Sequence, residues 1–383
     1  MLTASELEQV RLGLAKRSLG RSPKAEDVAG VLADVGSVVS DASVLEVTRR
    51  LRQDLSGAGP LQPLLARPGI TDVLVNGCDQ VFIDRGAGME QVESCFADED
   101  EVRELAVRFA AQCGRRLDDA SPFVDAQLPD GTRVHAILAP MASPGTCISL
   151  RVPAHRSFSL EDWVAGGGMS DEVCDILRRL IRLKRAFLVT GGTGSGKTTL
   201  LAGMLSEVSA AERIVVVEDS RELAPRHGHV VRLEARRPNV EGAGAIPMTA
   251  LVRQALRMRP DRLIVGEVRG AELSDMLHAL NTGHEGGCGT IHANCSADVP
   301  ARLLALGGLA GLSPETLRLQ VAAALNLVIS LERVARGNRV VTEIGIFEAD
   351  ATQLRVVPAI SRNLDGSYGR GAGWPLLAEL IAP

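Results

Sequence analysis

The spacing of hydrophobic and polar positions differs between successive parts of the 383-residue chain. In residues 1–57, apolar side chains recur at helical spacing between charged ones, as in Ser5–Arg17 and Ser43–Leu51. Such spacing predicts amphipathic helices. The run Ser56–Pro60 then interrupts the pattern. Residues 1–57 are therefore predicted to form a helical N-terminal extension.

The pattern changes to short alternating runs over residues 58–155. Alternation predicts half-buried strands, and the helical spacing of Asp98–Cys113 predicts one helix. Strands and a helix together indicate a small α+β domain. The predicted strands are Thr71–Asn76, Gln80–Asp84, Arg133–Leu138 and Cys147–Val152.

Residues 156–170 contain the run Gly166–Gly168 and are predicted to form a linker. Strand and helix signals then alternate regularly, which predicts an α/β domain over residues 171–383 with a mostly parallel sheet. The predicted strands are Ala186–Thr190, Ile214–Val217, Val230–Leu233, Leu263–Val265 and Gly289–His292. The predicted helices are Asp171–Leu183, Lys197–Val208, Met248–Met258, Glu272–Asn281 and Ser296–Leu306. Arg339–Ile346 and Gln353–Val357 are predicted to pair as a hairpin.

Charge and composition narrow the class of protein. Lys plus Arg number 42 and Asp plus Glu 47, a net charge of −5, and aromatic residues make up 3%. Both facts disfavour direct nucleic-acid binding. The sequence has no apolar run of the ~18–20 residues that a membrane span needs, and its first residues do not resemble a signal peptide. Seven dispersed cysteines are typical of reduced thiols. We expect a cytoplasmic protein.

A phosphate-binding motif stands between a predicted strand and a predicted helix. Gly191–Thr198 matches G-x-x-x-x-G-K-[ST]. In such a loop, backbone N–H groups and the helix N-terminus face the phosphates of a nucleotide. Lys197 is expected to reach the β- and γ-phosphates, and the Thr198 hydroxyl to hold Mg²⁺. ATP and Mg²⁺ are therefore the expected cofactors, contacted by Gly192, Thr193, Gly194, Ser195, Gly196, Lys197, Thr198 and Thr199.

Carboxylates follow two further predicted strands. Glu218 and Asp219 come directly after Ile214–Val217, and Glu267 follows Arg262–Gly266. The carboxyl ends of parallel strands meet at one edge of a sheet, so these groups are expected beside the phosphate loop. One carboxylate would orient Mg²⁺, some contacts passing through water, and another would deprotonate the attacking water. Glu222 is a further candidate. Gly266 stands where many P-loop enzymes have a magnesium-binding Asp.

Two other groups of residues invite a functional interpretation. His284, Cys288, His292 and Cys295 resemble a zinc set, but their spacing lacks the paired knuckles of structural zinc sites, so no zinc is expected. His292 either senses the γ-phosphate or is an ordinary histidine. Several arginines precede the phosphate loop in the sequence, and they suggest that the first domain closes over the nucleotide. They are Arg115, Arg116, Arg133, Arg151 and Arg156.

From about Ala58 to Leu331 the chain resembles the secretion ATPases of type II and type IV systems, above all the tight-adherence (CpaF-type) branch. The resemblance is carried by motifs in order. Gly191–Thr198 resembles the Walker A motif, Val217–Leu223 the Asp box, Leu256–Gly270 the Walker B motif and Asn281–Asn294 the His box; Val75–Gly77 and Ser121–Val134 resemble the N-terminal domain. In this family Gly commonly replaces the Walker B Asp. Cys288, Cys295, the stretch after Leu306 and the short segment before residue 58 depart from the pattern.

The resemblance implies a RecA-like P-loop ATPase domain preceded by a PAS-like α+β domain. It implies a homohexamer at the inner face of the cell membrane that acts on an inner-membrane platform protein, and on pilin only indirectly. Catalytic roles would fall to Glu267, Glu218, Lys197 and His292, and Mg²⁺ would be held by Thr198, Glu218 and Asp219. Arg133 or Arg151 would contact phosphates.

The expected activity is ATP hydrolysis that powers assembly of a Flp or type IV-like pilus, or secretion. A conjugation or type IV secretion motor and a pilus retraction motor carry the same motifs. A non-hydrolysing, nucleotide-dependent scaffold is disfavoured because Lys197, Thr198, Glu218 and Glu267 are all present.

Overall fold

The computed structural model describes residues 30, 31, 34, 57–86, 88–153, 158–236, 238, 242–334, 338–350 and 352–382. The chain divides into two compact units, Met1–Pro153 and Ala154–Pro383. Most of the predicted helical extension, residues 1–57, lies outside the described residues.

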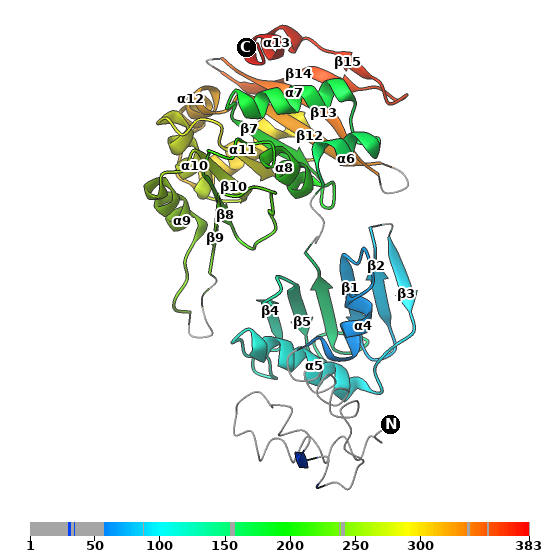
Figure 1. The fold of residues 1–383 in the computed structure, drawn as a ribbon. Helices are drawn as coiled ribbons and strands as arrows, with labels where there is room; N and C mark the ends of the chain where they lie inside the picture. Colours follow the sequence, from blue (N-terminus) through cyan, green and yellow to red (C-terminus); the bar gives the residue numbers. More distant parts are fainter. Residues whose placement is uncertain are drawn as a thin grey trace. The chain divides into compact units, whose positions relative to one another are not determined.

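The first unit is a six-stranded antiparallel sheet with a helix on one face (Figure 1). The strand order is β3-β2-β1-β6-β5-β4, and the helix α5 packs on β4 and β5. Asp98 caps α5 by accepting from the Glu101 N–H at 2.9 Å. The elements are η1 (Gly59–Leu61), α4 (Gln62–Leu65), β1 (Asp72–Asn76), β2 (Val81–Asp84), β3 (Met89–Val92), α5 (Glu99–Gln112), β4 (Phe123–Gln127), β5 (Arg133–Ile137) and β6 (Cys147–Arg151). The predicted α+β arrangement is confirmed.

The second unit is built on a nine-stranded sheet of order β15-β14-β13-β12-β7-β11-β10-β8-β9. Neighbours from β12 to β9 pair in parallel, and β13, β14 and β15 add an antiparallel edge. The strands are β7 (Phe187–Gly191), β8 (Ile214–Glu218), β9 (Val230–Glu234), β10 (Arg262–Val268), β11 (Cys288–Ile291), β12 (Leu327–Arg333), β13 (Arg339–Ala349), β14 (Leu354–Arg362) and β15 (Tyr368–Arg370). This is the mostly parallel sheet that the sequence predicts.

Helices cover both faces of this sheet (Figure 1). Side chains of β7 alternate between two hydrophobic cores: Phe187 and Val189 face one, and Leu188 faces the other. The first core includes residues of α6 (Leu160–Ala165), α7 (Asp171–Arg182), α8 (Lys197–Leu205) and α13 (Trp374–Leu380). The second includes residues of α9 (Met248–Ala255), α10 (Glu272–Asn281), α11 (Val299–Leu309) and α12 (Pro314–Ala324). Two 3₁₀ turns, η2 (Leu256–Met258) and η3 (Ser296–Asp298), complete the unit.

The segment 156–170 differs from the linker that its glycines predict. Residues 160–165 form α6, whose Leu160 and Trp163 are buried in the first core. Ser159 and Asp162 form a capping box at its start. Gly168 packs against the Trp163 ring, where a Cβ atom would lie 2.7 Å from Cε3. The glycines therefore form a tight turn after a docked helix, because the apolar residues before them are anchored in the core.

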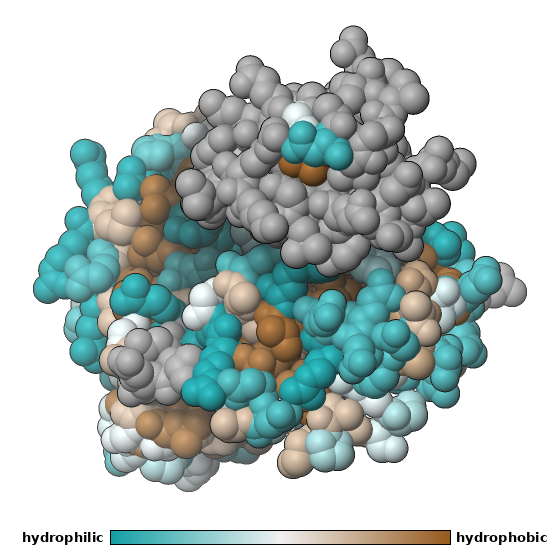
Figure 2. All heavy atoms as spheres, turned by 90° about the horizontal axis from the view of Figure 1, so that it is seen from below, coloured by the Kyte–Doolittle hydropathy of each residue, from teal (hydrophilic) through white to brown (hydrophobic). Residues whose placement is uncertain are grey.

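The exposed hydrophobic residues are dispersed. Large exposed side chains lie on several elements, including Met89, Phe123, Met141, Leu309, Leu319 and Leu364. Figure 2 shows one face of the molecule, on which hydrophobic patches are separated by hydrophilic residues. Within the part of the chain that the structure describes, no helix combines the length and the hydropathy needed to span a bilayer.

Candidate functional site

The phosphate loop joins the buried strand β7 to α8. Gly194 and Gly196 have φ angles of 74° and 95°, which L side chains rarely adopt. A Cβ atom on Gly196 would also lie 2.8 Å from Arg339 Cδ and 3.1 Å from Trp163 Cη2. Arg339 Nε donates to the Gly194 carbonyl at 3.2 Å. Both the tight turn and its packing therefore require glycine at position 196.

Lys197 lies inside this loop rather than in solvent. Its Nζ donates to the carbonyl oxygens of Gly191 at 2.8 Å and Gly192 at 2.9 Å, and the residue is buried. Burial lowers the pKa of Lys197, and the opposing attraction of Glu267 and Glu222 is the smaller effect. The ammonium group is thus held at the loop by two carbonyls that phosphate oxygens can replace.

The remaining predicted loop residues differ in exposure. Gly192, Thr193 and Gly194 are exposed, and Thr199 is half-buried. Ser195 is buried, and its Oγ has no hydrogen-bond partner among the described residues. Thr198 Oγ1 lies 3.4 Å from Glu222 Oε2. The loop therefore offers one buried and one half-buried hydroxyl beside Lys197.

Glu218 ends β8 and is almost completely buried. Its Oε1 accepts the N–H groups of Glu222 at 3.0 Å and Leu223 at 2.8 Å. Its Oε2 is buried and has no hydrogen-bond partner in the described residues. Burial raises the pKa of Glu218 to about 7, although the two N–H donors act in the opposite direction. One oxygen is thus fixed, and the other remains available to a cation.

Glu267 lies near the end of β10 between Arg269 and His292. Its Oε2 pairs with Arg269, and its Oε1 lies 3.1 Å from His292 Nε2, at ion-pair distance although the two groups are not aligned for a hydrogen bond. Burial lowers the pKa of His292, and the charges of Lys197, Arg269 and Arg302 act in the same direction while Glu267 opposes them. His292 is therefore mostly neutral at neutral pH.

The structure brings four of the predicted residues to one edge of the sheet. Lys197 begins α8, Glu218 ends β8, Glu267 lies near the end of β10, and His292 directly follows β11. The charge of Glu267 acts on both Lys197 and His292. Asp219 is exposed and acts electrostatically on Arg269. Arg269, Arg302 and Arg339 were not predicted. The sequence could have pointed to Arg269, because it follows the predicted Glu267 by only two residues. Arg302 and Arg339 are brought to the site only by folding.

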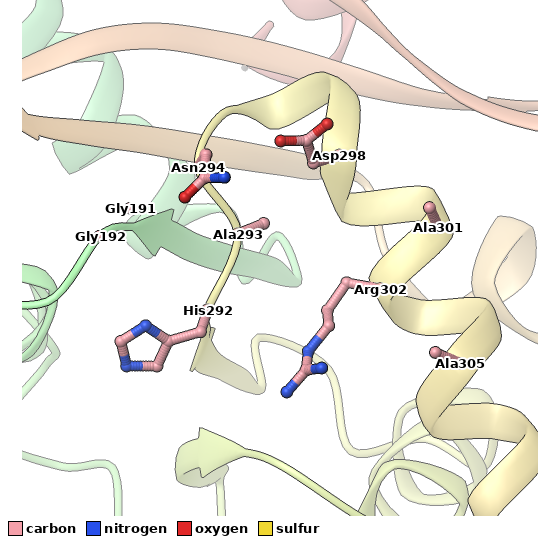
Figure 3. A pocket seen from close by; sticks show the side chains of 9 residues that line it. All are labelled: Gly191, Gly192, His292, Ala293, Asn294, Asp298, Ala301, Arg302 and Ala305. Atoms are coloured by element: carbon pink, nitrogen blue, oxygen red, sulfur yellow. The ribbon is translucent and has the colours of Figure 1, made fainter.

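A pocket of about 360 Å³ opens between the phosphate loop, the end of β11 and α11. Figure 3 shows the His292 ring at the end of β11 and the Arg302 side chain extending from α11 toward that strand end, whereas the Asp298 carboxylate points toward Asn294. The lining residues are Gly191, Gly192, His292, Ala293, Asn294, Asp298, Ala301, Arg302 and Ala305.

The residues considered for zinc do not form a cluster. Cys288 is buried in β11 and Cys295 is exposed, while His284 Nδ1 lies 3.3 Å from the Ala279 carbonyl oxygen. Among the residues that the structure describes, no three His, Cys, Asp or Glu side chains gather as a metal site. The Thr198 hydroxyl and the unpaired Glu218 Oε2 are hard oxygen donors of the kind Mg²⁺ prefers, so the loop fits a magnesium nucleotide.

Comparison with known proteins decides the family. A family model described as "Type II/IV secretion system protein" matches residues 54–358. The chain belongs to this family. A putative conjugal transfer protein of Mycobacterium tuberculosis is 50% identical over 326 residues, 84% of this chain and 93% of the relative. The type IV secretion system protein PtlH of Bordetella pertussis is 34% identical over 303 residues, 72% of this chain and 89% of PtlH.

The solved structure of the ATPase DotB from Legionella pneumophila has the same fold as this type II/IV secretion system protein. The TM-score is 0.54 at 20% identity, covering 80% of this chain and 82% of DotB. The RecA-like α/β fold with a separate N-terminal α+β unit is thereby confirmed. It is the fold that the motifs led us to expect.

Of the predicted arginines of the secretion protein, Arg115, Arg116, Arg133 and Arg151 lie in the first unit. Arg133 on β5 is directly opposite Arg151 on β6, and Arg151 Nε lies 2.9 Å from Asp72 Oδ1. Arg156 lies outside the described residues. A phosphate contact by Arg133 or Arg151 remains a prediction.

Proposed function

We propose that this chain is a Mg²⁺-dependent ATPase of a secretion or pilus machine. The observation that carries the proposal is the Glu267–His292 pair beside a buried Lys197 that is held by loop carbonyls. These groups supply a base, a phosphate-sensing imidazole and a phosphate-binding cation at one edge of one sheet.

Nucleotide binding would begin with an exchange of partners at Lys197. Its ammonium group leaves the carbonyls of Gly191 and Gly192 and binds the β- and γ-phosphates. Thr198 and the free Oε2 of Glu218 would hold the magnesium ion, with Asp219 contributing through water. Bound Mg²⁺ neutralises charge that develops on the phosphate oxygens.

Glu267 would take the proton of the attacking water. Arg269 pairs with one oxygen of the carboxylate and His292 Nε2 lies 3.1 Å from the other, so both partners favour one orientation of the group. Neutral His292 carries one N–H. A nearby phosphate anion favours the imidazolium form, in which both ring nitrogens donate. The charge of His292 would therefore report the presence of the γ-phosphate.

Family membership supports a proposal for the wider assembly. We propose a homohexamer at the cytoplasmic face of the inner membrane, in which Arg133 or Arg151 of the N-terminal unit (residues 58–155) contacts phosphates. Hydrolysis would move this unit against the ATPase unit (residues 171–383) and drive an inner-membrane platform protein. The N-terminal unit would thereby couple nucleotide state to motion.

The proposed cargo process is assembly of a tight-adherence or type IV-like pilus. The relatives named for conjugal transfer and type IV secretion favour transport of another macromolecule as the second candidate. In either case the expected ATPase chemistry is the same, so only an experiment in the cell separates them.

The test is to delete the locus and restore it with wild type or with Lys197→Ala. Loss of surface pili that only wild type restores supports an assembly motor. Pili that persist or multiply contradict assembly and leave retraction or another cargo. Phosphate release by the purified protein at background level would instead favour a non-hydrolysing scaffold, and stimulation by single-stranded DNA would favour a nucleic-acid motor.

A further inference from the structure

The pocket beside the phosphate loop has a wall that the proposed reaction does not use. On one side lie the backbone of Gly191 and Gly192 and the ring of His292, which face the phosphate-binding groups. On the other side lies the first turn of α11 with Arg302. The pocket therefore adjoins the place where a γ-phosphate would be cleaved, on the face of the sheet opposite α8.

Arg302 supplies this wall with a positive charge. Within the described part of the chain, its guanidinium has no hydrogen-bond or ion-pair partner. Figure 3 shows the guanidinium extending toward the space beside His292. Ala301 and Ala305, its neighbours on the helix, are small and place no competing polar side chain in the pocket. An arginine in this setting is suited to a small tetrahedral oxyanion, which it binds with two parallel N–H groups.

The negative and positive groups that line the pocket lie at different ends of it. Asp298 is the pocket's only carboxylate among the described residues, and it lies beside Asn294, one helical turn before Arg302 (Figure 3). The end formed by Arg302, His292 and the loop backbone is thus the cationic end. An anion entering from the phosphate loop meets this end first.

We propose that this pocket binds the inorganic phosphate formed by hydrolysis, with Arg302 as its anchor, before the phosphate leaves the enzyme. The inference rests on the proposed ATPase function. Hydrolysis forms a bond between the water oxygen and the γ-phosphorus and breaks the bond to the β–γ bridging oxygen, which stays with ADP. The new dianion is repelled by ADP, and Arg302 attracts it into the pocket.

The test measures binding of inorganic phosphate to the full chain in the presence of Mg²⁺ and ADP, with radiolabelled phosphate. Arg302→Gln removes the charge and keeps similar bulk. Its phosphate affinity is expected to fall about tenfold or more, the loss typical of a charged hydrogen bond. Its affinity for fluorescent ADP is expected to change less than about twofold, because Arg302 belongs to α11 and not to the phosphate loop.

Two further variants test whether the effect is specific to the charge of Arg302. Arg257→Gln removes an exposed arginine from η2, which does not line the pocket, and is expected to leave phosphate binding unchanged. Asp298→Asn removes the opposing charge and is expected to leave phosphate affinity equal or higher. Equal phosphate binding by wild type and Arg302→Gln would overturn the inference.

The outcome is separable from the proposed function. ATP turnover by wild type together with unchanged phosphate affinity in Arg302→Gln rejects the phosphate pocket and leaves the ATPase intact. Phosphate binding that depends on Arg302 in a chain without turnover supports the pocket as an anion site and rejects the ATPase. Faster phosphate release by Arg302→Gln, with unchanged cleavage in single-turnover measurements, supports both.

Discussion

The side chain of Glu218 occupies the space in which a Cβ atom on Gly266 would lie. That atom would be 2.5 Å from Glu218 Cγ and 3.2 Å from its Oε1. Glu218 ends β8, Gly266 lies two residues before the end of the neighbouring strand β10, and both come one step after the registered pair Val217 and Val265. The carboxylate of Glu218 therefore takes the place in which an aspartate at position 266 would project, which explains why the magnesium-binding Asp of other P-loop enzymes is absent here.

Gly266→Ala is expected to destabilise the protein by about 1–3 kcal/mol through overpacking and to displace Glu218. Chemical denaturation measures the change in the free energy of unfolding. In a Glu218→Ala background the same substitution is expected to cost much less, because Cγ and the carboxylate are gone. Equal costs in the two backgrounds would show that the two residues do not compete for space.

The stability of the protein is expected to fall as pH rises from 4.5 to about 7 because of Glu218. Its pKa is raised from 4.5 to about 7, so in this window the folded state keeps a proton that the unfolded state has lost. The accumulated effect is about 3 kcal/mol at and above neutral pH. Glu218→Gln lacks this effect while its amide oxygen still accepts from Glu222 and Leu223.

The measurement is a comparison of unfolding free energies of wild type and Glu218→Gln between pH 4.5 and 8 in buffer with EDTA. The variant should gain stability relative to wild type across the window. Parallel curves would mean that the carboxylate is already ionised in the folded state.

Glu267→Gln is expected to retain nucleotide binding and to lower turnover by about 10²–10⁴-fold, the range for loss of a general base. Steady-state phosphate release and fluorescent ATP binding give the two quantities. Glu93→Gln, an exposed glutamate of the first unit, is the control and should hydrolyse as wild type does. Wild-type turnover by Glu267→Gln would assign the proton transfer to another group.

The cysteines should differ sharply in reactivity. Burial raises the pKa of Cys288 to about 12 and that of Cys174 to about 11, while Cys95 and Cys295 are exposed. In the native protein, Ellman's reagent should modify Cys95 and Cys295 first, and Cys174 and Cys288 only on unfolding. Cys295→Ser should remove one fast equivalent. Rapid modification of Cys288 in the folded protein would contradict its place inside β11.

Short-range patterns predicted much of this fold. The strand before Gly191 and the helix after it were readable because apolar runs and glycines specify them locally. In contrast, β3 and β4 were missed, and the four residues of β3 are Met, Glu, Gln and Val, with three exposed. An edge strand that buries little has no alternation to read. The helix α12 and the strand β12 were also missed, since the apolar run from Val321 to Leu331 passes from one to the other.

The sequence by itself determined the family, the phosphate loop and the strand-end carboxylates, because these depend on residue type and spacing along the chain. Only the tertiary structure decided which distant residues meet. It placed Glu218 over Gly266, His292 against Glu267, Trp163 under the phosphate loop and Arg302 in the pocket beside it. Such contacts follow from the packing of strands and helices that are 25 to 100 or more residues apart in the chain, which no local pattern encodes.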